Sequence, residues 1–214
     1  MKKSLLFALV SSAMVLATSC TNLDVDVKSQ YTDYPTESEV ALEAKMADVY
    51  YAFRKQLGDN YNRIQSFSSD EVAGISFDGD YYDNAENVNP TLHNFKYDNK
   101  PLNYWADLAS GITKCNQVIE DLGGDKAKPE QIAPARVMRA FYHFILMDSF
   151  GDVPILDCLP DDDEAVERMP RRQVAEFIES ELKDCLPSLT KNCNAATYGK
   201  PTYWMAEALL VKLY

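Results

Sequence analysis

The sequence of 214 residues contains only two histidines, and none of its five cysteines forms a CxxC pair or a cluster with histidine. Such clusters supply many zinc and redox sites, so we expect no metal centre and no cofactor. No serine or cysteine stands in a recognisable nucleophile motif, and no two carboxylates stand out as the acid and base of a glycosidase. The sequence therefore favours a binding protein over an enzyme.

Positive charge is also scarce, because 21 lysines and arginines face 33 aspartates and glutamates, which gives a net charge of −12. An acidic surface repels nucleic acid and anionic lipid headgroups. We therefore expect no nucleic-acid partner. Any attachment to a membrane must come from something other than a basic patch.

Only one long apolar run is present, from Leu5 to Ala17, and it follows the positive pair Lys2 and Lys3. It is shorter than the roughly 20 apolar residues that a membrane-spanning helix needs, and it is typical of the core of a signal peptide. Small residues then lead directly to Cys20. A lipoprotein signal peptidase requires this pattern, since the thiol of the new N-terminus carries the lipid.

We therefore predict a lipoprotein signal peptide at 1–19, a lipid on Cys20, and a polar tether over 20–35 that connects the lipid to a folded body at 36–214. Several acyl chains on one cysteine are enough for stable anchoring. The alternative is an ordinary secretory signal with an incidental cysteine. No second apolar stretch is long enough to cross a membrane.

The body has the apolar periodicity of helices. We predict an all-α fold in which short or medium loops join helices that pack in pairs. The helix over 134–150 is apolar nearly all round, so it should be central and buried, with Pro134 tolerable only in its first turn. A capping box of Thr36 and Glu39 should start the first helix, and Gly58 should end it. The expected helices cover 36–57, 102–122, 134–150, 172–186 and 202–214.

Two stretches resemble the hallmark segment of the SusD/RagB family, the nutrient-binding outer-membrane lipoproteins of Bacteroidetes. They are Ala135–Phe144 and the Phe-Gly-Asp-Val-Pro-Ile sequence of Phe150–Ile155. Further similarity lies at Ser69–Glu71, at Pro170-Arg171 and at Gly199–Thr202, and it extends over nearly the whole chain from Cys20 to Tyr214. The resemblance implies a superhelix of tetratricopeptide-like helix pairs with long loops that bind a glycan or a peptide.

The resemblance also implies partners and a location. Such proteins cap a TonB-dependent transporter in the outer membrane and hand it the ligand, with the body exposed at the cell surface. Family members are more than twice as long as this chain, so the C-terminal half of the family is expected to be missing. A truncated helical scaffold that contacts the transporter without binding a ligand is therefore the alternative.

Residues 59–101 have no sustained helical period and are rich in Asp, Asn, Gly and Tyr, which is typical of a functional loop. In a sugar site, aromatic rings would stack on pyranose faces and polar side chains would bond to hydroxyl groups. The alternative is that the tyrosines pack onto the helices. The candidate ligand residues are Tyr81, Tyr82, Asp83, Asn84, His93 and Asn94.

The remaining polar and sulfur-containing residues have structural interpretations. Arg136 and Arg139 lie on the most apolar helix, so they should pair with carboxylates such as Asp152 or with acidic groups on neighbouring helices. The acidic run at 161–164 lacks the spacing of a calcium loop and is expected to be solvated. Cys115 and Cys185 should be buried and Cys158 and Cys193 should lie in loops, with a disulfide among the four as an open alternative.

Overall fold

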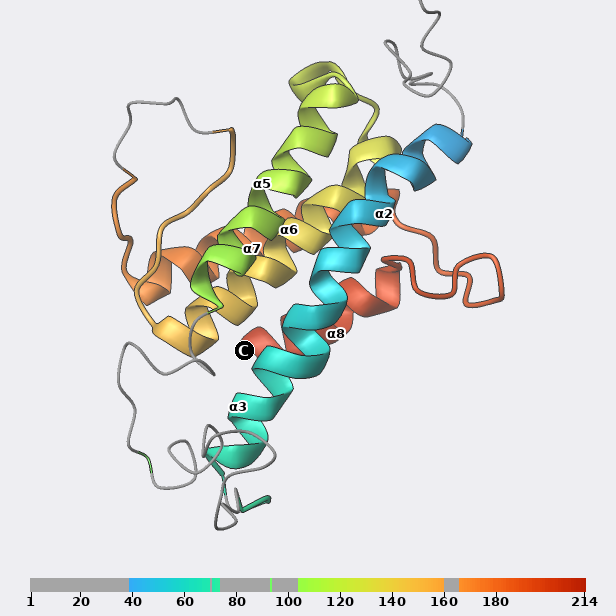
Figure 1. Ribbon diagram of the computed structural model, residues 1–214. Helices are drawn as coiled ribbons and strands as arrows, with labels where there is room; N and C mark the ends of the chain where they lie inside the picture. The colour runs from blue at the N-terminus through green and yellow to red at the C-terminus, as the bar shows by residue number, and fades with distance from the viewer. Residues whose placement is uncertain (1–38, 70, 74–92, 94–103, 160–165) are drawn as a thin grey trace, which may run out of the picture. The chain divides into compact units, whose positions relative to one another are not determined.

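The computed structural model describes residues 39–69, 71–73, 93, 104–159 and 166–214, which all belong to the unit Pro35–Tyr214. Every regular element in this part of the chain is a helix (Figure 1), and one isolated antiparallel bridge joins Val153 to Met169. The all-α prediction is confirmed. The long helices are α2 (Glu39–Lys55), α5 (Trp105–Asp121), α6 (Pro129–Phe150), α7 (Arg171–Cys185) and α8 (Tyr203–Leu213).

Helices that follow one another in the chain pack against each other, α2 on α5, α5 on α6, α6 on α7 and α7 on α8. The central helix α6 also contacts α2 and α8, so some long helices that are not consecutive in the chain are in contact as well. Figure 1 shows α5, α6 and α7 side by side. Stacking of each helix on its chain neighbours is the arrangement of tetratricopeptide-like helix pairs, and it agrees with the predicted architecture.

The ends of three helices match the prediction closely. Helix α5 starts at Trp105 and ends before Gly123, whose φ of 112° only glycine adopts easily. Between α5 and α6 lies the short 3₁₀ helix η3 (Gly124–Lys126), and α7 continues into a second one, η4 (Leu186–Ser188). At the start of α8 the Thr202 hydroxyl accepts a hydrogen bond from the Met205 amide, which caps the helix.

The prediction for the start of α6 was wrong. Pro129 occupies the first turn, and Pro134, which was expected there, lies inside the helix. A proline is tolerated at this position because its missing N–H leaves only the carbonyl of the exposed Glu130 without a helical donor. The helix ends where Gly151 adopts a φ of 80° and its amide bonds to the Met147 carbonyl.

The predicted end of the first helix at Gly58 was also wrong. The helix widens there into the π-helical segment η1 (Gln56–Tyr61) and continues as α3 (Asn62–Phe67). Two polar contacts hold the wide turn: Asn60 donates to the buried Gln56 side chain at 2.8 Å, and the part-buried Tyr61 hydroxyl donates to Asp148 on α6 at 2.8 Å. The first part of the predicted 59–101 loop is therefore helical. Thr36 of the predicted capping box lies outside the described residues.

Helix α5 approaches α6 closely at one position. Gly111 is buried on α5, and a Cβ placed there would overlap the ring of Tyr142 on α6. The Tyr142 ring is fully buried, and its hydroxyl donates to the Val49 carbonyl of α2 at 3.1 Å. One side chain thus connects three helices. In the described part of the chain, no helix is long and apolar enough to cross a membrane.

Candidate functional site

Of the six predicted ligand residues, the structure describes one. His93 is exposed and has a φ of 52°, a conformation that is uncommon for a residue other than glycine. Its Nε2 lies 2.9 Å from the carbonyl oxygen of Ser68, the residue that follows α3. His93 therefore lies beside the C-terminal end of α3. The other candidates, Tyr81, Tyr82, Asp83, Asn84 and Asn94, and the predicted lipidation site Cys20 lie outside the described residues.

The hallmark segment of α6 supplies a buried polar cluster. Arg139 is 7 % exposed and donates from Nε and Nη2 to Glu181 of α7, at 3.0 and 2.6 Å. Arg136 donates to the other oxygen of the same carboxylate, at 3.0 and 2.5 Å. One carboxylate, that of Glu181, therefore forms ion pairs with two arginines between α6 and α7. The expected pairing with an acidic group on a neighbouring helix is confirmed.

The expected pairing of an arginine with Asp152 was wrong. The Asp152 carboxylate instead accepts a hydrogen bond from the Arg171 backbone amide at 2.8 Å. Because that amide belongs to the first residue of α7, whose N–H has no partner within the helix, Asp152 acts as its cap. Together with the Val153–Met169 bridge, this contact closes the base of the loop between α6 and α7.

The same polar cluster fixes the backbone that follows the hallmark sequence. Asn116 on α5 donates to the carbonyls of Leu156 and Cys158 at 3.2 and 2.6 Å, and its side-chain oxygen accepts from Arg139 at 2.8 Å. Arg139 also donates to the Asp157 carbonyl. These contacts satisfy part-buried backbone acceptors of the loop, and such groups are costly to leave unpaired when water is excluded. The role of both α6 arginines is therefore structural.

His143 completes this arrangement. It is fully buried on α6, and its Nδ1 lies 2.8 Å from the Arg139 carbonyl, so Nδ1 carries the proton. Its Nε2 accepts a hydrogen bond from the Leu156 amide at 3.0 Å. Burial lowers the pKa of His143 to about 4, which keeps the ring neutral. The neutral imidazole holds the loop in place. Because both of its ring nitrogens take part in hydrogen bonds, neither is available for general acid–base chemistry.

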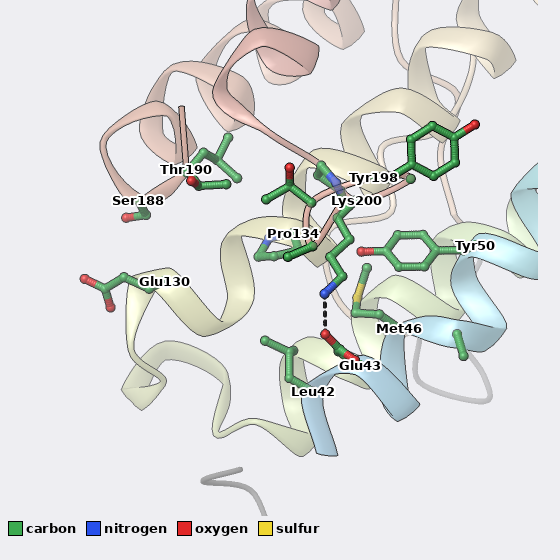
Figure 2. Close-up of a pocket in the computed structure, with 16 residues that line it drawn as sticks. Leu42, Glu43, Met46, Tyr50, Glu130, Pro134, Ser188, Thr190, Tyr198 and Lys200 are labelled. Atoms are coloured by element: carbon green, nitrogen blue, oxygen red, sulfur yellow. Dashed lines mark hydrogen bonds and ion pairs between the residues drawn. The ribbon is translucent and has the colours of Figure 1, made fainter. Parts of the chain in front are cut away.

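A cleft of about 570 Å³ lies elsewhere on the same unit. The first turns of α2 form one wall, the start of α6 forms another, and the segment 188–201 between η4 and α8 forms the third (Figure 2). The floor is apolar: Met46 is 2 % exposed, and Pro201 and Leu189 are also buried. Leu42 and Pro134 extend this apolar surface.

Polar and aromatic groups surround the apolar floor. Lys200 and Glu43 form an ion pair across the cleft, and Figure 2 shows the rings of Tyr50 and Tyr198 on one side of that pair. Tyr198 is 90 % exposed, whereas Tyr50 is half-buried. Burial, with the nearby Glu43 carboxylate, raises the pKa of Tyr50, so its hydroxyl remains protonated and able to donate.

Sequence reasoning did not find the cleft, because its three walls lie more than fifty residues apart in the chain and helical periodicity does not show that they meet. It also did not name Glu181 as the arginine partner. A signal for Glu181 was present, since this charged residue lies on the same face of α7 as the buried Ile178, Leu182 and Cys185. A carboxylate on an otherwise apolar stripe indicates a buried cationic partner.

No disulfide joins any two of the four described cysteines, so the open alternative of a disulfide among them was wrong. Cys115 and Cys185 are buried and Cys158 and Cys193 are exposed, as expected. Burial raises the pKa of both Cys115 and Cys185 to about 12. Among the described residues, no three His, Cys, Asp or Glu side chains are grouped so that they could hold a metal ion. The acidic run at 161–164 lies outside those residues.

Residues 23–214 match the model of a SusD-like family described as "Starch-binding associating with outer membrane". The chain is also 25% identical over 230 residues to a SusD-like protein of Bacteroides ovatus, and the match covers 100% of this chain and 39% of the relative. This chain therefore spans about two fifths of the length of the curated relative that it matches.

Solved structures show the same fold. A laminarin-binding SusD-like protein matches with a TM-score of 0.70 and 24% identity, over 83% of this chain and 40% of the other. The surface glycan-binding protein A of Bacteroides uniformis matches with a TM-score of 0.67 and 18% identity, over 82% and 41%. The family is described by binding and not by catalysis, which agrees with the expectation of a non-enzyme. The match over residues 23–214, together with this helical fold, shows that the chain belongs to the SusD-like family.

Proposed function

We propose that this chain forms the helical part of a cell-surface lipoprotein that binds carbohydrate and delivers it to a TonB-dependent transporter of the outer membrane. The observation that carries the proposal is the family match over residues 23–214, whose description names starch binding and association with the outer membrane. The likeness in fold to a laminarin-binding protein supports it. In this proposal a lipid on Cys20 holds the acidic body at the membrane.

The proposed carbohydrate site includes Tyr81, Tyr82, Asp83, Asn84, His93 and Asn94. Support comes from His93, whose exposed ring bonds to the Ser68 carbonyl. A histidine held at positive φ is a strained conformation of the kind that recurs at ligand sites. Tyrosine rings would stack on the apolar faces of sugar rings, while amide and carboxylate groups would bond to hydroxyl pairs.

Isothermal titration of the chain against starch, laminarin and other neutral polysaccharides tests the binding. Saturable heat from at least one of them is the expected result, and His93→Ala should weaken it. Tyr51→Ala is a matched control, because Tyr51 is 71 % exposed on α2 and is not among the proposed ligand residues. Heat of binding from a peptide library, with none from any polysaccharide, would show that the ligand is a peptide and not a sugar.

Delivery is tested by co-purification of the lipidated chain with outer-membrane transporters from the native membrane. A TonB-dependent barrel in the purified complex is the expected partner. Because the chain spans about two fifths of the length of its curated relative, a scaffold that contacts the barrel without binding sugar is the second candidate. Recovery of the barrel without any polysaccharide binding would favour that candidate.

A further inference from the structure

The cleft at the start of α2 is remote from His93, the one candidate ligand residue that the structure describes. Helical structure runs without a break from Glu39 through η1 to Phe67, and His93 contacts the residue that follows it. Met46, which lines the cleft, lies near the N-terminal end of this helical run. At 1.5 Å per helical residue, the two places are roughly 30 Å apart. A ligand of a few sugar rings cannot occupy both.

The third wall of the cleft is held in one conformation by its own hydrogen bonds. The Thr197 hydroxyl donates to the Asn192 carbonyl at 3.0 Å and accepts from the Asn194 amide at 3.0 Å. The Tyr203 amide bonds to the Thr190 carbonyl at 3.0 Å, which closes the two ends of the segment. A wall that is already ordered loses little conformational entropy when a ligand binds.

The lining of the cleft combines an apolar floor with tyrosine rings. Leu42, Met46 and Pro134 provide the floor, and Tyr198 presents a ring that is 90 % exposed. A cleft of about 570 Å³ lies within the range of small-molecule sites. The C–H faces of pyranose rings are apolar and flat, so they fit against such a floor and stack on such rings.

Hydrogen-bonding groups lie beside that floor. Lys200 has three ammonium donors, and its ion pair with Glu43 uses one of them within the described structure. The Glu43 carboxylate supplies an acceptor next to these donors. For the Tyr50 hydroxyl, no hydrogen bond is found among the described residues. A neighbouring donor and acceptor match two adjacent sugar hydroxyls, and charge-assisted bonds of this kind are strong.

The charges around the cleft select a neutral ligand. Glu43 neutralises Lys200, which leaves the exposed Glu130 as the uncompensated charge in the lining. The whole chain carries a net charge of −12, so a uronate or a sulfated sugar would be repelled. We propose that this cleft is a second carbohydrate site, which binds a short neutral oligosaccharide. This inference rests on the proposed carbohydrate-binding function.

The test is isothermal titration of the full chain, purified in detergent, with maltotriose and with laminaritriose. Two sites per chain are expected for at least one of these probes. Tyr198→Ala should weaken one of the two sites by roughly three- to tenfold, because it removes one stacking ring. Lys200→Met should weaken the same site and leave the other unchanged. Tyr198 is 90 % exposed, so its replacement does not threaten folding.

Two controls separate this inference from the proposed function. Tyr51→Ala removes an exposed tyrosine of α2 outside the cleft and should change neither site. His93→Ala should weaken only the site in the loop. The titration could instead show a single site per chain that is lost in His93→Ala and unaffected by Tyr198→Ala and Lys200→Met. That result would overturn the proposed second site but would leave the proposed function intact. The absence of any binding to the unmodified chain, with polysaccharides as well as with both trisaccharides, would overturn both.

Discussion

Arg139 on α6 and Glu181 on α7 form a buried ion pair in which Nη2 of the arginine lies 2.6 Å from Oε2 of the glutamate. The side chains are 8% and 7% exposed. The same carboxylate binds Arg136 through its second oxygen. The hallmark sequence of α6 is therefore connected to α7 by one acidic side chain that serves two arginines, and this connection also supports the loop that follows α6.

Replacement of Glu181 by alanine should lower the free energy of unfolding by about 3–5 kcal/mol, because it leaves a buried guanidinium without its counter-charge. Asp184→Ala is the control: Asp184 is 61% exposed and contacts Arg136 at 3.4 Å, so its removal should cost about 1 kcal/mol or less. Urea unfolding followed by circular dichroism measures both. Equal, small losses in the two variants would show that the buried pair does not stabilise the fold.

The stability of the protein should depend on the protonation of His143. The pKa of His143 is lowered by burial from 6.5 to about 4, so the folded state resists a proton that the unfolded state binds. The contribution of neutral His143 to the free energy of unfolding is therefore complete above pH 6.5 and is lost as the pH falls from 6.5 towards 4. The expected loss of unfolding free energy between pH 7.5 and 5.5 is on the order of 1 kcal/mol.

Chemical unfolding at several pH values in that range measures the effect, since carboxylates titrate mostly below it. His143→Gln should lower overall stability and remove this part of the pH dependence. If the slope persisted unchanged in His143→Gln, another group would be its source. An imidazole pKa near 6.5, measured for His143 in the folded protein by NMR, would also contradict the prediction.

A methyl group at Gly111 should separate α5 from α6. Gly111→Ala gains helix propensity, but its Cβ would overlap the Tyr142 ring, and overpacking of this kind costs about 1–3 kcal/mol. Gly58→Ala is a matched control, because a Cβ at that helical position meets nothing within 4 Å. The control should be neutral or stabilise by up to about 1 kcal/mol. Thermal melts that rank the two variants in the opposite order would contradict the packing at Gly111.

The thiols should divide into two classes. Burial raises the pKa of Cys115 and Cys185 to about 12, so neither forms the reactive thiolate at neutral pH. Cys158 and Cys193 are exposed. In native protein that carries Cys20→Ser, a thiol-specific reagent should modify two cysteines quickly and the other two only after denaturation. Rapid modification of all four would indicate that the core opens near Cys115 and Cys185.

Strong local patterns made much of the fold predictable. The helix over 134–150 is apolar nearly all round, and it is the central buried helix that this composition predicts. Gly123 and Gly151 both adopt positive φ where a helix ends, which explains why glycine marked those ends correctly. Thr202 occupies the N-cap of the last helix, a position that favours its side chain.

The errors came from features that depend on contacts between distant residues. Gly58 does not end the first helix, because Asp148 of α6 and neighbouring polar groups hold the chain in a π-helical turn there. A π turn shifts the apolar period by one residue, so periodicity cannot follow the helix through it. The cleft was unpredictable for the same reason, since the Lys200–Glu43 pair joins residues at opposite ends of the described chain. All six candidate ligand residues, His93 included, remain predictions.

The most direct test of carbohydrate binding is affinity electrophoresis in gels that contain laminarin or starch, with the triple variant Tyr81→Ala/Tyr82→Ala/His93→Ala beside the unmodified chain. We predict that at least one of the two polysaccharides retards the unmodified chain. The variant should bind that polysaccharide at least about tenfold more weakly, because two stacking rings are lost, while its melting temperature is unchanged. Unretarded migration of the unmodified chain in both gels, or equal retardation of the variant, would contradict the account.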